Sequence, residues 1–295
     1  MDQVVVKGWR RIGVRSYGVR GGSPVFLLHG TPGCRLSARP SDADLARLDV
    51  RLITYDRPGY GLSDPHAGRS VADAADDVRV IADYFGIDTF AVIGRSGGGP
   101  HALACAALLP KRVTRAAALL TPAPFDADDL DWFHGMVELN RSTYGAAVLG
   151  PRELARIIFP QVEAMRSDPE HFLRRLEEGA TPEDLATISD PVYRAEFAAS
   201  ITEAIGRSLA GWAGDSMAFT RPWGFELQWI KAPTLLWHIT TDVFTPVSHA
   251  RWLAGRITNV ILKLSDQGSH MWVDRMQFDA IRWLLEGRVP DRAAG

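Results

Sequence analysis

The chain has 295 residues, of which 46% are hydrophobic and 23% charged, and its formal net charge is −2. This composition is typical of one large globular domain, or of a core domain with an insertion, and the charge gives no reason to expect a nucleic-acid or membrane partner. There is no apolar stretch that predicts a signal peptide or a transmembrane span. The two cysteines do not make a disulfide framework, so we expect a cytoplasmic protein.

The first part of the chain predicts alternating strands and helices. Residues 4–6 and 12–19 alternate apolar and polar side chains, which indicates an antiparallel pair of half-buried strands. Continuous apolar runs predict buried strands over residues 24–28, 51–55, 90–93 and 113–120. Helical patterns cover residues 36–48, 71–85 and 100–109, with Ser70 as the expected N-cap of the second.

The pattern changes at about residue 123, and from there to about residue 230 it predicts helices only. Three helix starts are marked by a capping residue followed by proline: Asp168-Pro169, Thr181-Pro182 and Asp190-Pro191. Strand and helix then alternate again over residues 233–240, 246–257, 260–264 and 271–286.

This order predicts an α/β fold with a mostly parallel central sheet flanked by helices and an inserted all-helical cap. Residues 1–123 and 231–295 would form the core domain and residues 124–230 the cap domain. We expect the cap to lie over the carboxyl ends of the strands, where ligands of such sheets bind.

The most informative stretch follows the predicted strand 90–93. It reads Gly94-Arg95-Ser96-Gly97-Gly98 and leads directly into an alanine-rich helix. A serine at so sharp a turn from strand to helix needs neighbours without a Cβ at Gly94 and Gly98, because strand and helix approach closely there. Such a turn exposes the serine hydroxyl above a helix N-terminus, which favours developing negative charge.

Further motifs share the chain order of one family. They are His29-Gly30-Thr31-Pro32-Gly33, Asp56-Arg57-Pro58-Gly59-Tyr60-Gly61-Leu62-Ser63, Gly94-x-Ser96-x-Gly98, Asp242 and His270. In combination they resemble the α/β-hydrolase fold family, and the resemblance covers nearly the whole chain outside the helical insertion.

The resemblance implies a Ser-His-Asp constellation. Ser96 would be the nucleophile, His270 its general base, and Asp242 the acid that orients the imidazole. The backbone N–H of Gly97 and that of Thr31 would form the oxyanion hole. No metal and no cofactor are needed for this chemistry.

Two assignments leave alternatives open. The family's usual pattern before the acid is Trp-His-Gly-x-x-Asp, whereas this chain has Ile239 in place of the glycine, so Asp126 after the strand 113–120 is the alternative acid. Arg95 could pair with a carboxylate of the cap, meet an anionic group of the substrate, or form a structural ion pair.

The activity expected from these residues is hydrolysis of a carboxylic ester, thioester or lactone of a small hydrophobic substrate, because the insertion is rich in aromatic residues. Proline aminopeptidases of the same fold usually have His-Gly-Gly-Pro-Gly and a tryptophan after the serine, where this chain has Thr31 and Gly97. The alternatives are a lyase, cyclase or acyltransferase on the same scaffold, and a ligand-binding protein with little turnover. The sequence does not define the oligomeric state.

Overall fold

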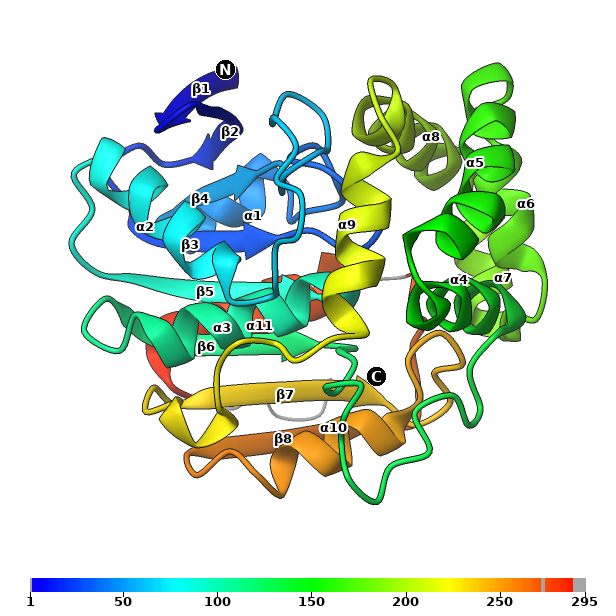
Figure 1. The fold of residues 1–295 in the computed structure, drawn as a ribbon. Coiled ribbons are helices and arrows are strands. Elements are labelled where there is room, and N and C mark those ends of the chain that lie inside the picture. Colours follow the sequence, from blue (N-terminus) through cyan, green and yellow to red (C-terminus); the bar gives the residue numbers. More distant parts are fainter. Residues whose placement is uncertain (1, 272–273, 289–295) are drawn as a thin grey trace.

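The central element of the structure is one eight-stranded sheet with the order β1-β2-β4-β3-β5-β6-β7-β8 (Figure 1). This computed structural model describes residues 2–271 and 274–288. The first two strands pair antiparallel to each other and β2 pairs antiparallel to β4, whereas all following pairs are parallel. The strands are β1 (Asp2–Lys7), β2 (Arg10–Gly18), β3 (Ser23–Leu28), β4 (Val50–Tyr55), β5 (Phe90–Arg95), β6 (Val113–Leu119), β7 (Thr234–Ile239) and β8 (Val260–Ser265).

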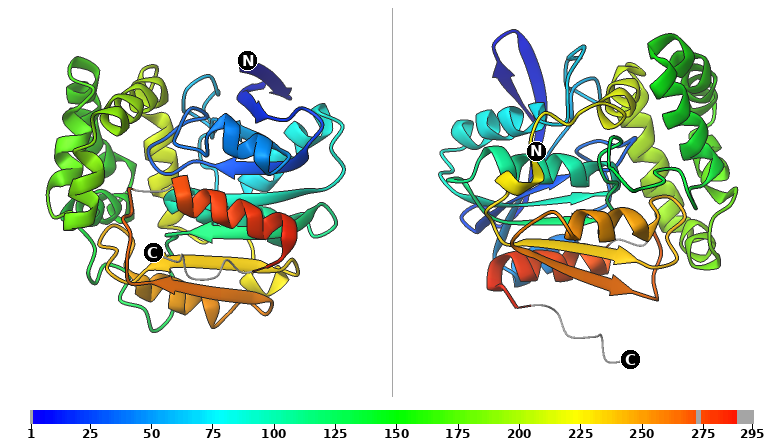
Figure 2. Two further views of the ribbon diagram at one scale, coloured as in Figure 1. Left: turned by 180° about the vertical axis from the view of Figure 1, so that it is seen from behind. Right: turned by 60° about the horizontal axis from the view of Figure 1, so that its bottom comes forward.

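Helices cover both faces of this sheet, as Figures 1 and 2 show from opposite sides. On one face lie α2 (Asp73–Tyr84), α3 (Gly99–Leu108) and α10 (Val247–Ala254), and on the other α1 (Asp42–Arg47) and α11 (Asp274–Glu286). Successive residues of a strand face opposite sides, so Val92 packs in the first layer and Ile93 in the second. This explains why the central strands are apolar without alternation. The predicted α/β class with a mostly parallel sheet is confirmed.

Between β6 and β7 the chain forms a series of helices that gather beside the carboxyl ends of the strands (Figure 1). The last of them is joined to the core, because Phe219 and Trp223 belong to the same hydrophobic cluster as Leu103 of α3. The helices are α4 (Glu138–Leu149), α5 (Pro151–Ser167), α6 (His171–Glu177), α7 (Pro182–Ile188), α8 (Pro191–Ile205) and α9 (Ala210–Phe219), followed by the short 3-10 turn η2 (Leu227–Trp229).

Two of the three marked helix starts in this insertion are as predicted. Thr181 caps α7 in a reciprocal capping box with Asp184, and Asp190 caps α8 by accepting from the N–H groups of Val192 and Tyr193. The third helix, α6, begins at His171 and not at residue 169, because Asp168 accepts from the N–H of Glu170 in a separate turn first.

Two further helix boundaries predicted from the sequence were wrong. The helix expected over residues 36–48 is only α1, which begins after its N-cap Ser41, because Asp56 binds the N–H of Arg35 and holds the preceding segment as a loop. Helix α2 begins at Asp73, whose carboxylate accepts from the N–H and hydroxyl of Ser70, so Ser70 is not the N-cap. The helix expected from residue 271 is described from Asp274 onward, and residues 272–273 lie outside the described chain. Within that described chain, no helix is long and apolar enough to cross a membrane.

Candidate active site

Ser96 lies at the turn between β5 and α3, in the short 3-10 segment η1 (Ser96–Gly98). Its backbone has a φ of +50°, a left-handed conformation that is unfavourable for a residue with a side chain. The turn is so tight that a Cβ on Gly94 would lie 2.1 Å from the carbonyl oxygen of Gly98. A Cβ on Gly98 would lie 2.1 Å from that of Leu28. Both glycines are therefore required by the close approach of strand and helix.

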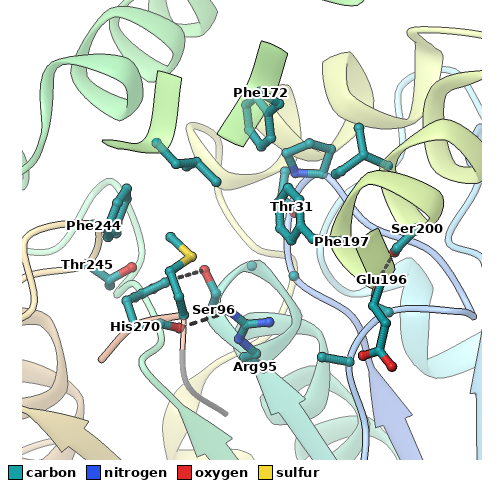
Figure 3. Close-up of a pocket in the computed structure, with 18 of the residues that line it drawn as sticks. Thr31, Arg95, Ser96, Phe172, Glu196, Phe197, Ser200, Phe244, Thr245 and His270 are labelled. Carbon is teal, nitrogen blue, oxygen red and sulfur yellow. Dashed lines mark hydrogen bonds between the residues drawn. The ribbon is translucent and has the colours of Figure 1, made fainter. Parts of the chain in front are cut away.

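A continuous chain of hydrogen bonds joins Ser96 to two residues from distant loops. His270 follows β8 and Asp242 follows β7, so both lie at the same edge of the sheet as Ser96. Nε2 of His270 is 3.1 Å from Oγ of Ser96 (Figure 3), and its Nδ1 is 2.8 Å from Oδ2 of Asp242. Because a carboxylate can only accept, Nδ1 carries a proton, and in the tautomer protonated there Nε2 can accept from the serine hydroxyl.

Asp242 is held as an anion by its surroundings. Its Oδ1 accepts from the backbone N–H groups of Phe244 (2.8 Å) and Thr245 (3.0 Å), which leaves Oδ2 for His270. Burial favours the protonated acid, but His270 and these hydrogen bonds hold the pKa of Asp242 below its ordinary value. Asp126, the alternative acid, is exposed. The structure therefore places Asp242 beside the imidazole, although Ile239 replaces the usual glycine.

Thr31 and Gly97 lie directly beside each other next to Ser96. A Cβ built on Gly97 would come within 2.3 Å of Oγ1 of Thr31, so the side chain of Thr31 lies directly against the backbone of Gly97. Both residues and Ser96 line the same cavity.

Arg95 faces the cavity beside Ser96 and contacts the histidine loop. Its Nη2 donates a hydrogen bond of 2.9 Å to the backbone carbonyl of His270 (Figure 3). The guanidinium thus ties the end of β5 to the loop that carries the imidazole. A backbone carbonyl was not among the three partners that the sequence suggested for Arg95.

The cavity above Ser96 has a volume of about 550 Å³. Its floor is polar and comes from the loops after the strands, whereas its far wall is formed by the inserted helices (Figure 3). The apolar side chains contributed by that wall are Phe172, Leu176, Tyr193, Phe197 and Ile201. Such a cavity suits a small molecule with a polar group at Ser96 and an apolar remainder.

Sequence reasoning missed a buried cluster of charges behind Thr31. Asp215 of α9 is completely buried and contacts Arg57 and Arg69, each with a closest distance of 2.6 Å. Asp215 is the one charged residue of the otherwise small and apolar helix α9. An isolated acid in such a stretch indicates a buried carboxylate with a cationic partner. That signal was present, but it does not identify the partner.

Two other buried histidines predict that the protein loses stability in mild acid. Burial lowers the pKa of His101 and of His249, each to about 4, whereas an unfolded histidine titrates near 6.5. The unfolded chain therefore binds protons that the folded chain cannot, so stability present above pH 6.5 is lost as the pH falls toward 4. Each such histidine lowers the free energy of unfolding by about 1.4 kcal/mol for every pH unit between pH 6.5 and pH 4.

Urea unfolding at a series of pH values checks this expectation. The free energy of unfolding should decrease continuously from pH 6.5 to pH 4.5. In His249→Gln the free energy of unfolding should decrease less steeply with falling pH, and the difference in slope should correspond to the uptake of about one proton, the contribution of a single histidine. Identical pH slopes in the two proteins would contradict the assignment of His249 as a buried neutral group.

Among residues 2–271 and 274–288, no group of three or more His, Cys, Asp or Glu side chains is arranged to hold a metal ion.

Sequence comparison places the chain in a family. The model of the alpha/beta hydrolase fold family matches residues 23–274. The protein belongs to this family.

Relatives of known activity include esterases. The chain is 27% identical over 267 residues to the pimeloyl-(acyl-carrier protein) methyl ester esterase of Chromobacterium violaceum, covering 90% of this chain and 94% of that protein. It is 34% identical over only 96 residues to a proline iminopeptidase of Neisseria gonorrhoeae, covering 31% and 30%. The solved enol-lactonase from Burkholderia xenovorans shares the fold with a TM-score of 0.67 and 19% identity, covering 96% and 99%.

Proposed function

We propose that the protein is a serine hydrolase that cleaves a carboxylic ester, thioester or lactone of a small hydrophobic substrate through an acyl-enzyme on Ser96. The observation that carries this proposal is the unbroken hydrogen-bonded chain Ser96–His270–Asp242 at the floor of the cavity. A chain of this kind is what activates a neutral serine, which is otherwise a weak nucleophile.

In the proposed mechanism Ser96 Oγ attacks the carbonyl carbon of the ester while Nε2 of His270 takes its proton. The tetrahedral intermediate collapses when the imidazolium returns this proton to the departing alcohol, which leaves the acyl group on Ser96. A water molecule then attacks the acyl-enzyme with the same base, and the carboxylic acid is released. Asp242 keeps the imidazole in the tautomer that accepts from Ser96 and stabilises its charged form.

The developing oxyanion is proposed to bind between the backbone N–H of Gly97 and that of Thr31. Gly97 is the first residue of the chain after the nucleophile, and Thr31 is in contact with it. Removing one such donor costs roughly 10²- to 10³-fold in kcat in enzymes of this type.

We propose a division into a core of residues 1–123 with 231–295 and a cap of residues 124–230, and the contribution of both parts to the cavity lining supports it. The cap side is mostly apolar, although Asn140, Glu196 and Ser200 also line it, and this supports a hydrophobic acyl or alcohol group. A small molecule is the partner that a cavity of about 550 Å³ accommodates. The two cysteines, Cys34 and Cys105, are buried free thiols, which supports a cytoplasmic location.

Labelling with a fluorophosphonate tests the mechanism, because this reagent modifies a serine only when the serine is activated. We expect stoichiometric modification of the wild type, mapped to the peptide that contains Ser96, and its loss in His270→Ala. A folded wild-type protein that is not labelled would contradict the serine-hydrolase mechanism and favour a binding protein. Burst kinetics with a p-nitrophenyl acyl ester would separately establish the acyl-enzyme.

A further inference from the structure

The cluster around Asp215 extends from the cap to the loop that carries Thr31. One oxygen of the carboxylate, Oδ2, accepts from the hydroxyl of Thr31 at 2.6 Å, from that of Tyr60 at 2.9 Å and from Nη2 of Arg57 at 2.6 Å. The other, Oδ1, accepts from Arg69 at 2.6 Å. Burial favours the neutral acid, but the two arginines outweigh it and hold the pKa of Asp215 well below its usual range.

Arg57 connects this carboxylate to the backbone of the same loop. Besides Asp215, its guanidinium donates to the carbonyl oxygen of His29, to that of Gly30 at 2.9 Å and to Oγ1 of Thr31 at 3.0 Å. All these groups are buried or half-buried. The planar fork of an arginine fixes several acceptors at once, which a lysine cannot do.

The side chain of His29 also contacts the backbone carbonyl of Gly30. Its Nδ1 lies 2.7 Å from the carbonyl oxygen of Gly30, and its Nε2 lies 3.2 Å from the backbone N–H of Arg57. Burial, together with the charge of Arg57, lowers the pKa of His29 well below its usual value, so the ring is neutral. Nε2 must accept from the N–H of Arg57, so Nδ1 carries the proton and donates to Gly30.

The direction of one N–H group follows from these contacts. The peptide between Gly30 and Thr31 is planar and trans, so its N–H points away from its C=O. His29 and Arg57 both hold the C=O of Gly30 on the side of the buried cluster. The N–H of Thr31 is therefore turned to the opposite side of the same peptide, and Thr31 lies against Gly97 and the cavity.

We propose that Asp215 and Arg57 are positioning residues that fix the N–H of Thr31 as an oxyanion donor, an inference that rests on the function proposed above. Neither residue is among those that line the cavity. Asp215 fixes Arg57 and the hydroxyl of Thr31, and Arg57 fixes the peptide whose N–H binds the oxyanion. Because Asp215 comes from α9, the inserted helices complete the oxyanion hole as well as cover the substrate.

The test is Asp215→Asn, which keeps the shape of the side chain but removes its charge. A displacement of about 1 Å in such a donor costs roughly 10²-fold in rate. We therefore expect kcat for p-nitrophenyl butyrate to fall about 10- to 100-fold, with KM changed less than about threefold. The inhibition constant of butylboronic acid, which forms a tetrahedral adduct on an activated serine, should rise by a factor similar to the loss in kcat. Binding of butyrate should change little.

Asp77→Asn is the matched control for destabilisation. Asp77 on α2 is as deeply buried as Asp215 and, like Asp215, does not line the cavity. Its partners are Arg10 (2.6 Å) and Lys7 (2.8 Å) of the first two strands, whereas Asp215 contacts Thr31. We expect it to lower the melting temperature without changing kcat or boronic acid binding. Equal losses of kcat in the two variants would overturn the positioning role, since they would show a general effect of destabilisation.

A second pair of variants keeps the test decisive if Asp215→Asn does not fold. Thr31→Val removes the hydroxyl that contacts both Asp215 and Arg57 while preserving shape, and Thr31→Ser restores it. The valine variant should lose kcat and boronic acid affinity together, and the serine variant should recover most of both. If the wild type is labelled at Ser96 but kcat is unchanged in both Thr31→Val and Asp215→Asn, this inference alone is overturned. A wild type that is neither active nor labelled would overturn the proposed function and this inference with it.

Discussion

Ser96→Ala is expected to lower kcat for ester hydrolysis roughly 10⁴- to 10⁶-fold, because it removes the proposed nucleophile on which the acyl-enzyme would form. The variant should fold normally. Alanine meets the same backbone strain at φ +50° as serine does, and the serine hydroxyl is hydrogen-bonded to one side chain, His270. The measurement is kcat with a p-nitrophenyl ester, together with the melting temperature of the variant and of the wild type.

The control for this variant is binding. Calorimetric titration with the ester should give a dissociation constant close to the one obtained from the concentration dependence of the wild-type burst rate, since the cavity walls are unchanged. Retention of more than about a tenth of kcat would contradict the acyl-enzyme and favour a lyase, cyclase or transferase that does not need Ser96 as nucleophile.

The sequence predicted those parts of the fold that depend on local patterns. The buried strands were recognisable from apolar runs, and the turn at Ser96 from glycines whose absent Cβ atoms leave room for the carbonyls of Gly98 and Leu28. Helix starts with a capping side chain and a following proline, such as Thr181 and Asp190, were also readable, since the cap and the helix are neighbours in the chain.

What the sequence could not predict depends on contacts between distant residues. The loop before α1 looked helical because its own residues permit a helix. Contacts with distant residues hold it in another conformation, among them the bond from the N–H of Arg35 to Asp56, 21 residues further along, and the contact between the hydroxyls of Ser37 and Ser200. Likewise, Thr31 and Asp215 are separated by 184 residues, so no local pattern connects the loop of Thr31 to α9. The order Ser96, Asp242, His270 was readable, whereas the cluster that supports Thr31 required the folded chain.

Asp242→Asn is the second substitution for which we expect a large loss of kcat, and the hydrogen bonds of Asp242 explain the loss. Oδ1 of Asp242 accepts from two backbone N–H groups, those of Phe244 and Thr245. In the asparagine variant the amide oxygen must take this position, because an NH₂ group cannot accept from two N–H donors. The NH₂ group then faces Nδ1 of His270, which must become an acceptor, so that the ring proton moves to Nε2.

A histidine with its proton on Nε2 cannot accept the proton of Ser96. We therefore expect kcat to fall about 10⁴-fold, a loss of the size that the same change causes in serine proteases, with little change in KM. Fluorophosphonate labelling of Ser96 should slow in proportion, because it needs the same base. The control is Asp126→Asn at the exposed alternative acid, which should leave kcat and labelling unchanged. If Asp126→Asn lost activity while Asp242→Asn kept it, the acid of the proposed mechanism would have to be reassigned.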